Sequence, residues 1–548
     1  MDVSALSDPG MISIVLVCGL LFALAIGMPL GLASAVLALL VMIMKFEPTL
    51  LVNPMSFGEG LLTGRPGTGP LYILTQKIFD LLTEYVLISV PLFIFMAALL
   101  ERSGVAKAMY DSLDFWLSRT RGGIAIVTSL MAVLLAAMSG IIGGEIVLLG
   151  LIALPQMLRL GYNQNLAIGT ICASGSLGTM IPPSIVLIIY GLITETSIKA
   201  LFTGAFIPGF MLASFIILYI IIRTRVNPSL APLPEPREGD PEGPEKRSMF
   251  LGFLCLLVAS VATLLLFRAL IYTFTGMNAN IEEGNDPYWL GMPYHLPYLG
   301  GVIAVMLALI FFVFGFKRTM AGWENGKGLV PPLTIITIVL GSIYGGVTGI
   351  TEAAGMGALA VFVIALLRGE ASVGLLWDSL MRTLRSTGTI IWVTVGAAAL
   401  SGAYTLAGGP AYIAQLIVGA EMPTFLVLLT MMLILLFMGA FMDWVGIVLL
   451  IIPVFLPIVR AMPIEEIGLI GQLSPSQVSV WFGVLFCMNM QVSFLSPPFG
   501  GAAFYLKSVA PPHISLTDIF KGFLPFIGLQ LLALSVLLIW PSIVTILL

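Results

Sequence analysis

Long apolar runs separated by short polar segments recur along the whole chain. Many of them reach the length of about 20 residues that a helix needs to cross a bilayer. Glycine-rich interruptions fall at 27–31 within the apolar stretch 11–44, and at 345–349 within the stretch 331–367. We interpret each interrupted stretch as a pair of helices. The pattern predicts an all-α integral membrane protein.

Two stretches look like imperfect copies of each other, and each contains a hairpin and a break. The first copy predicts a re-entrant hairpin over 122–158 and a span over 165–193 that is broken at 178–184. The second predicts a hairpin over 423–459 and a broken span over 479–506. The Pro-Pro pair in each break removes two backbone donors and disfavours helix at the preceding residue. Paired broken spans indicate the binding site of a transporter.

The copies divide the chain into two repeats and an insertion. The first repeat, 1–222, holds scaffold helices over 11–121 and the hairpin and broken helix over 122–193. The second repeat covers 331–548. The insertion, 223–330, combines a proline-rich linker with two extra spans.

The remaining elements follow from the same pattern. The extra spans of the insertion are expected over 249–273 and 298–316. In the second repeat, an amphipathic segment at 371–386 precedes a crossing segment at 387–407, and a last span covers 522–546.

The distribution of charge predicts a topology. Only 9% of the residues are charged, against roughly 25% in a soluble domain. If the first hairpin has its ends in the cytoplasm, 18 of the 24 Lys and Arg lie on the cytoplasmic side and five on the opposite side. The excess of basic residues in cytoplasmic segments supports this orientation. It places both termini in the periplasm and gives the two copies inverted topology.

Composition argues against an enzyme. The chain has two histidines, His295 and His513, which lie far apart in sequence. Its four cysteines are scattered singly in apolar runs and form no metal-ligand or redox spacing. We expect no organic cofactor, and nothing in the sequence suggests nucleic-acid binding.

Polar side chains cluster at both breaks. Free N–H groups of broken helices suit an anionic substrate, whereas hydroxyl and carbonyl oxygens suit Na⁺. The alternative is a kinked structural helix whose Ser and Thr side chains join neighbouring helices. The polar residues are Ser139, Ser174, Ser176, Thr179 and Ser184 at the first break, and Asn489, Gln491, Ser493 and Ser496 at the second.

Three carboxylates lie inside apolar stretches, where ionisable groups are candidates for function. Glu145 and Asp443 fall near the two hairpin tips, and Glu352 follows the glycine-rich interruption of the second repeat. The first two could equally cap a hairpin or face water, and Glu352 could close a tight packing site.

Several motifs, in order, resemble the large membrane (M) subunit of tripartite ATP-independent periplasmic (TRAP) transporters. They cover most of 11–222 and 331–546. The motifs are Gly178-x-x-x-Pro182-Pro183-Ser184, Gly349-Ile350-Thr351-Glu352-Ala353-Ala354, Asp443-Trp444 with Pro453 and Pro457, and Ser496-Pro497-Pro498-Phe499-Gly500.

The resemblance implies a Na⁺-driven secondary transporter of the ion-transporter superfamily in the bacterial inner membrane. Its two hairpins and two broken helices would move like an elevator against the scaffold. Its partners would be a periplasmic substrate-binding protein and a small four-helix membrane (Q) subunit, and its substrate a small organic anion such as a C4-dicarboxylate. The extra spans, the linker and a long segment at 46–80 depart from the usual pattern.

Carried over by position, the resemblance also implies site residues. Substrate would lie between two Na⁺ sites, each formed by a hairpin tip and a break. The substrate-binding candidates are Ser139, Gly140, Thr179, Pro182, Pro183, Ser184, Ser496, Pro497 and Pro498. The Na⁺ candidates are Ser139, Ser174, Ser176, Gly178, Gly439, Asp443, Ser493 and Ser496.

Two other functions remain open from the sequence. A stand-alone Na⁺/carboxylate carrier of the same superfamily would need no binding protein. A membrane scaffold or channel subunit would show no saturable, Na⁺-dependent uptake.

Overall fold

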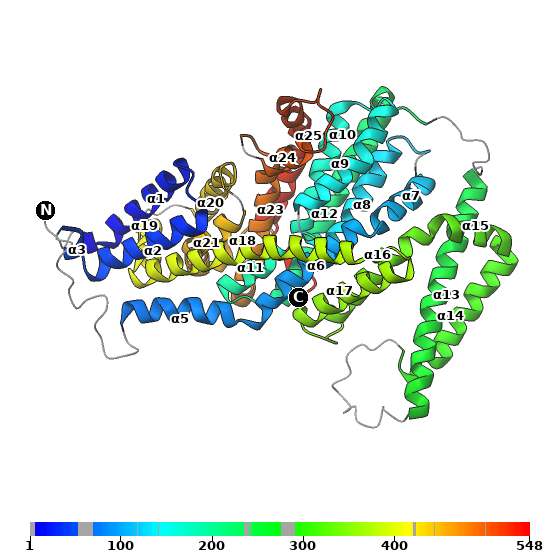
Figure 1. Ribbon diagram of the computed structural model, residues 1–548, viewed down its shortest axis with the longest axis horizontal. Coiled ribbons are helices and arrows are strands. Elements are labelled where there is room, and N and C mark those ends of the chain that lie inside the picture. Colours follow the sequence, from blue (N-terminus) through cyan, green and yellow to red (C-terminus); the bar gives the residue numbers. More distant parts are fainter. Residues whose placement is uncertain are drawn as a thin grey trace.

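The computed structural model describes residues 6–52, 69–117, 119–140, 142–234, 241, 243–275, 291–419, 423–442, 444–498 and 500–548. Within these ranges every regular element is helical, which confirms the all-α prediction for the described part of the chain (Figure 1). Ten of the described helices are long and apolar enough to cross a membrane. Length and composition therefore indicate a multi-pass membrane protein.

The first half of the chain runs from two helices that flank Gly27 to one long helix that contains Pro208. Its helices are α1 (Pro9–Ala25), α2 (Leu30–Phe46), α3 (Thr49–Val52), α5 (Pro70–Thr83), η2 (Tyr85–Ile88), α6 (Ser89–Arg102), α7 (Val105–Leu117), α8 (Gly123–Ser139), α9 (Ile142–Arg159), α10 (Gln164–Gly175), η3 (Ser176–Thr179), α11 (Ile185–Thr194) and α12 (Ile198–Val226).

The middle of the chain adds a helix pair, α13 (Gly243–Thr275) and α14 (Leu296–Ala308), with η4 (Pro228–Leu230) before the pair and η6 (Pro293–His295) between its helices. A π-helical turn, η7 (Leu309–Phe314), continues α14 and leads to α15 (Phe316–Gly326) and η8 (Lys327–Leu329). In Figure 1, α13 and α14 lie at the right edge, apart from α8 to α12. Close approach of Gly252 to Thr319 and of Gly322 to Met249 packs α13 against α15.

The second half resembles the first in the order of its elements. Its helices are α16 (Val330–Tyr344), α17 (Ile350–Leu367), α18 (Val373–Leu406), α19 (Gly409–Gly419), α20 (Thr424–Gly439), α21 (Trp444–Leu450), α22 (Ile452–Ala461), η9 (Ile464–Glu466), η10 (Pro475–Gln477), α23 (Val478–Leu495), α24 (Gly501–Lys507), α25 (Leu516–Ile539) and η11 (Pro541–Val544).

Side-chain caps fix where several of these helices begin. Asn163 accepts a hydrogen bond from the Leu166 amide ahead of α10, Ser197 from Ala200 ahead of α12, and Ser372 from Leu375 ahead of α18. Ser515 and Asp518 form a capping box that starts α25 at Leu516, earlier than the predicted start at 522. Each cap satisfies a backbone donor that the first helical turn leaves free.

Two details of the second half differ from the sequence-based expectation. The segments predicted separately at 371–386 and 387–407 form the single helix α18, in which the Thr389 hydroxyl donates to the Arg385 carbonyl near the expected boundary. No proline interrupts α18 there, so the change from amphipathic to apolar sequence does not end the helix. The return arm of the second hairpin is instead divided into α21 and α22, with Pro453 in the first turn of α22.

The helices pack in two groups. In one group, α2 packs on α18 and α6 packs on α17 and α18. The other group contains α8 to α12 together with α20 and α23 to α25. Glycine allows close contact in both, since Gly396 of α18 meets the Gly31 carbonyl of α2, and Gly169 of α10 meets the Gly522 carbonyl of α25.

Candidate functional site

The tip of the first hairpin turns at Gly140 and lies directly on the first Pro-Pro break. Gly140 ends α8 with φ 63°, a left-handed conformation that glycine adopts without steric cost. A Cβ atom at this position would lie 2.5 Å from the Pro183 carbonyl oxygen and 3.4 Å from the Ile185 nitrogen. The hairpin tip therefore meets the break only because residue 140 has no side chain.

The first break separates η3 from α11, and all of it is buried. The Pro182-Pro183 bond is cis. Ser184 follows the pair and caps α11: its hydroxyl donates to the Thr179 carbonyl at 2.5 Å and accepts from the Leu187 amide at 3.4 Å. One serine thus connects the two ends of the break and satisfies a free donor of α11.

Glu145 joins the hairpin tip to the break. The Ser139 hydroxyl donates to Glu145 Oε1, and the same oxygen lies 2.6 Å from where a Cβ on Gly178 would stand. The Glu145 side chain is only 2% exposed, and its Oε2 has no hydrogen-bond partner. Glu145 therefore contacts both candidates, Ser139 and Gly178, although the resemblance implies no site role for it.

The other polar candidates of the first break contact residues from elsewhere in the chain. The Ser174 and Ser129 hydroxyls lie 2.9 Å apart. Two amides reach η3 from the second half: Gln530 Nε2 donates to the Ser176 hydroxyl at 3.4 Å, and Gln491 Nε2 to the Thr179 hydroxyl at 2.7 Å. Gln491 stood out in the sequence as a polar residue in an apolar span, whereas nothing local pointed to Gln530 (on α25).

The second hairpin tip packs on the second broken helix in the same way. A Cβ at Gly439 would collide with the Ser493 side chain, so these two candidates touch. The Ser493 hydroxyl donates to the Asn489 carbonyl at 3.3 Å, and Asn489 Nδ2 donates to the Met432 carbonyl at 2.9 Å. Asp443 lies outside the described residues.

The second break is more exposed than the first. Ser496 is half-buried and donates to the Val492 carbonyl at 2.8 Å, while Pro497 and Pro498, also joined by a cis bond, are exposed. A Cβ at Gly500 would lie 2.9 Å from the carbonyl oxygens of Phe494 and Ser496, so glycine permits the tight bend before α24. The two breaks thus share a plan but differ in access to solvent.

Glu352, the third carboxylate, lies in the other helix group. Its Oε1 accepts a hydrogen bond of 2.9 Å from the Tyr85 hydroxyl, and its Oε2 approaches Gly349. The contact joins the start of α17 to η2 and supports the packing interpretation of this residue.

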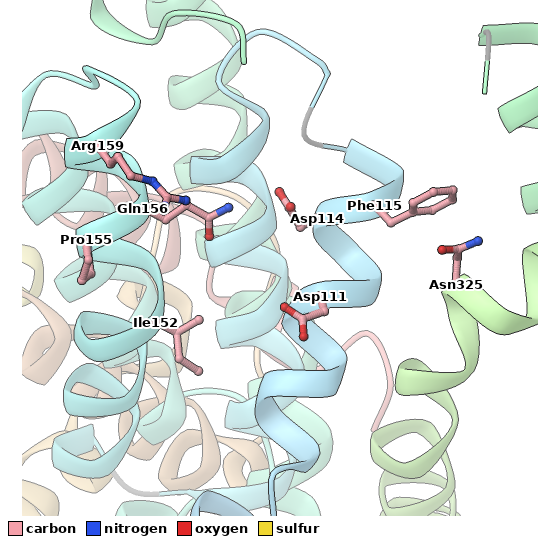
Figure 2. A pocket seen from close by; sticks show the side chains of 8 residues that line it. All are labelled: Asp111, Asp114, Phe115, Ile152, Pro155, Gln156, Arg159 and Asn325. Atoms are coloured by element: carbon pink, nitrogen blue, oxygen red, sulfur yellow. The ribbon is translucent and has the colours of Figure 1, made fainter. Parts of the chain in front are cut away.

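A cavity of about 560 Å³ opens between α7 and α9, apart from the predicted site residues (Figure 2). Arg159 and Gln156 of α9 face Asp111 and Asp114 of α7 across it. Burial and the nearby Asp114 carboxylate raise the pKa of Tyr110 on the same helix above its ordinary value. The cavity separates an arm of the first hairpin from the short helix that precedes it.

Arg460, at the end of the second hairpin, fastens that hairpin to both broken helices. Its Nε donates to the Ser479 hydroxyl at 2.8 Å and its Nη2 to the Thr194 carbonyl at 3.2 Å. Hydrogen bonds of charged groups are stronger than neutral ones, but solvent weakens them where the group is exposed, as Arg460 is. We therefore expect Arg460→Ala to lower the free energy of unfolding by about 1 kcal/mol. Thermal unfolding in detergent measures the loss.

Arg159→Ala is the matched control for this substitution. Arg159 occupies the corresponding place in the first copy, yet within the described part of the chain its side chain forms no hydrogen bond or ion pair. The control should unfold like the wild type. Equal melting temperatures for Arg460→Ala and the wild type would contradict the fastening role.

Two comparisons of the sequence with known proteins agree on the family. Residues 14–327 and 316–543 match the family model described as the tripartite ATP-independent periplasmic transporter, DctM component. The chain is similar to the C4-dicarboxylate TRAP transporter large permease protein of Pseudomonas aeruginosa, with 24% identity over 86% of this chain and 88% of that protein. It is also similar to the isethionate TRAP transporter permease protein of Oleidesulfovibrio alaskensis, with 24% identity over 96% of this chain and 69% of that protein.

Among solved structures, the fold is similar to that of the YdaH transporter of Alcanivorax borkumensis. The TM-score is 0.51 at 16% identity, and the match covers 93% of this chain and 97% of that one. At this identity the likeness concerns the fold alone.

Proposed function

We propose a substrate, a coupling ion and a mode of movement for this chain, which belongs to the DctM component family of tripartite ATP-independent periplasmic (TRAP) transporters. The chain is a transporter permease and not an enzyme. In our proposal it imports an organic anion, a dicarboxylate or another carboxylate, together with Na⁺. It resides in the bacterial inner membrane with both termini in the periplasm, as the distribution of basic residues indicates.

The observation that carries the proposal is the matched contact of two hairpin tips with two breaks. Gly140 lies on the break at Pro183, and Gly439 lies on Ser493 beside the other break. The Gln491–Thr179 hydrogen bond joins the two broken helices. Broken helices whose free backbone groups meet inside the protein form the substrate and ion sites of many secondary transporters.

An anionic substrate suits the groups that the breaks provide. The start of α11 follows the first break, and a helix N-terminus favours negative charge. Ser496 and the exposed Pro497 and Pro498 leave the second break accessible from solvent. The Pseudomonas aeruginosa relative is named for C4-dicarboxylate, which supports a carboxylate substrate here.

The residues at the first tip fit a hard monovalent cation such as Na⁺. Three buried side-chain oxygens near η3 have no hydrogen-bond partner: Glu145 Oε2, Gln491 Oε1 and Gln530 Oε1. Oxygen donors of this kind, with the hydroxyls of Ser139, Ser174 and Ser176, are what such a cation prefers. Na⁺, when bound, supplies positive charge and the driving force of its gradient.

Elevator movement is supported by the division of the helices into two packed groups. The group with the first hairpin, α20 and both broken helices would be the mobile part, and the group with α2, α6, α17 and α18 the scaffold. At their border, the ion pair between Glu101 and Arg382 lies against Gly144, next to the first hairpin tip. Because Gly144 has no side chain, the first hairpin could move past Glu101 and Arg382 without a steric clash at this contact.

A tripartite family implies two partners, which we propose to be a periplasmic substrate-binding protein and a small membrane subunit. We expect proteoliposomes with the permease, the small subunit and a loaded binding protein to take up a carboxylate only under an inward Na⁺ gradient. Omission of the binding protein should abolish uptake, and replacement of Na⁺ by K⁺ should do the same.

Two other outcomes of the uptake experiment would favour the alternative functions. Strong Na⁺-dependent uptake without a binding protein would favour a stand-alone carrier. Non-saturable flux that is independent of Na⁺ would favour a channel.

A further inference from the structure

Glu145, a buried carboxyl group near the first break, has no partner of opposite charge among the described residues. Glu145 is in the first turn of α9, and its Oε1 accepts from Ser139 while its Oε2 has no partner. In the part of the chain that the structure describes, no Lys or Arg forms an ion pair with Glu145. A buried ionised carboxylate without a counter-charge is strongly unfavourable.

Two cationic side chains on neighbouring helices are bonded to groups other than Glu145. Arg382 of α18 pairs with Glu101 of α6, and this pair borders Gly144, the residue before Glu145. Lys507 of α24, a helix that packs on α9, donates to the Ile514 carbonyl. Because no described side chain forms an ion pair with Glu145, an ionised Glu145 must be neutralised from solution, by a proton or by a cation.

The surroundings of Glu145 are those of a cation site and not of a cap. Gln530 and Gln491 use their amide nitrogens on Ser176 and Thr179, the first and last residues of η3, so each keeps a buried oxygen free. Gly178, between these residues, lies against the Glu145 carboxylate. Three side chains that contact η3 thus each keep a buried acceptor oxygen without a hydrogen-bond partner.

We infer that Glu145 is the charged ligand of the coupling Na⁺ at the first hairpin site. The inference rests on the proposed function, to which it adds a residue and a consequence. A carboxylate that travels with the hairpin must be neutralised before the hairpin crosses the apolar scaffold. Glu145 therefore makes movement of the mobile helices depend on bound Na⁺.

The test measures Na⁺ binding without transport. The purified permease, with its small subunit, is unfolded thermally in detergent over a series of NaCl concentrations at constant ionic strength, with KCl as the balance. We expect Na⁺ to raise the melting temperature of the wild type. Glu145→Gln, which keeps the shape and still accepts from Ser139, should raise the half-maximal Na⁺ concentration at least tenfold.

Glu352→Gln is the matched control, because it makes the same change at a carboxylate bonded to Tyr85 in the other helix group. It should keep the Na⁺ dependence of the wild type. If Glu145→Gln does not fold, Glu145→Asp keeps the charge on a shorter side chain and should shift the same dependence severalfold.

The outcomes separate this inference from the proposed function. An unchanged Na⁺ dependence in Glu145→Gln, or in Glu145→Asp where the first does not fold, overturns the role of Glu145 while Na⁺ coupling stands. A wild type that Na⁺ does not stabilise, and that takes up substrate without Na⁺, overturns Na⁺ coupling and the inference with it.

Discussion

Gly140→Ala should abolish substrate uptake while the protein still inserts into the membrane. The new methyl group would stand 2.5 Å from the Pro183 carbonyl oxygen, which belongs to backbone and cannot rotate away. Residue 140 also has φ 63°, which costs an L-residue roughly 1–2 kcal/mol. The first hairpin tip must therefore move off the break, and the site between them is lost. Uptake into proteoliposomes, normalised to the amount of inserted protein, measures the effect.

Gly346→Ala separates the two expected causes of the lost uptake, which are the steric clash with Pro183 and the positive φ angle. Gly346 has φ 66°, close to that of Gly140, but no atom lies within 4 Å of its expected Cβ position. The control should lose a little stability and keep most of its uptake. Near-normal uptake by Gly140→Ala, or equal losses in both variants, would contradict a role for the contact between tip and break.

The sequence predicted those parts of the fold that depend on local signals. Proline pairs, glycine interruptions and the length of apolar runs predicted that the chain is helical and crosses the membrane many times. The change from an amphipathic segment at 371–386 to a crossing segment at 387–407 did not indicate that both belong to the single helix α18, because a change of polarity without proline does not end a helix.

The contacts among the site residues depend on packing between distant segments. Gln530 reaches Ser176 across 354 positions, and Gln491 reaches Thr179 across 312. No periodicity in one helix indicates which buried amide of another helix will face it. Glu145 is different: its place six residues after Ser139, past a glycine turn, was visible in the sequence, but its missing counter-charge was visible only in the structure.

The unequal exposure of the two breaks bears on the transport cycle. The first break is fully buried, whereas Pro497 and Pro498 of the second are exposed. An elevator that opens to one side at a time would present its two breaks unequally in any one state. In the proposed elevator mechanism, a substrate would reach residues at the second break in this conformation, while residues at the first break would stabilise the closed packing.

This difference predicts two distinct ways of losing transport. Ser184→Leu should abolish uptake and lower the melting temperature, because the fully buried hydroxyl bonds both Thr179 and Leu187 and leaves no space for leucine. Ser496→Leu should abolish uptake with little change in melting temperature, because Ser496 is half-buried beside exposed prolines. Its one bond goes to its own helix.

Ser535→Leu is the control for Ser496→Leu, since Ser535 is an exposed serine that donates to the carbonyl four residues earlier at the same 2.8 Å. Removal of that bond alone should leave uptake unchanged. A loss of uptake in Ser496→Leu with normal stability then reflects the place of the side chain in the path of the substrate. Normal uptake in both Ser184→Leu and Ser496→Leu would refute the assignment of the two breaks to the transport site.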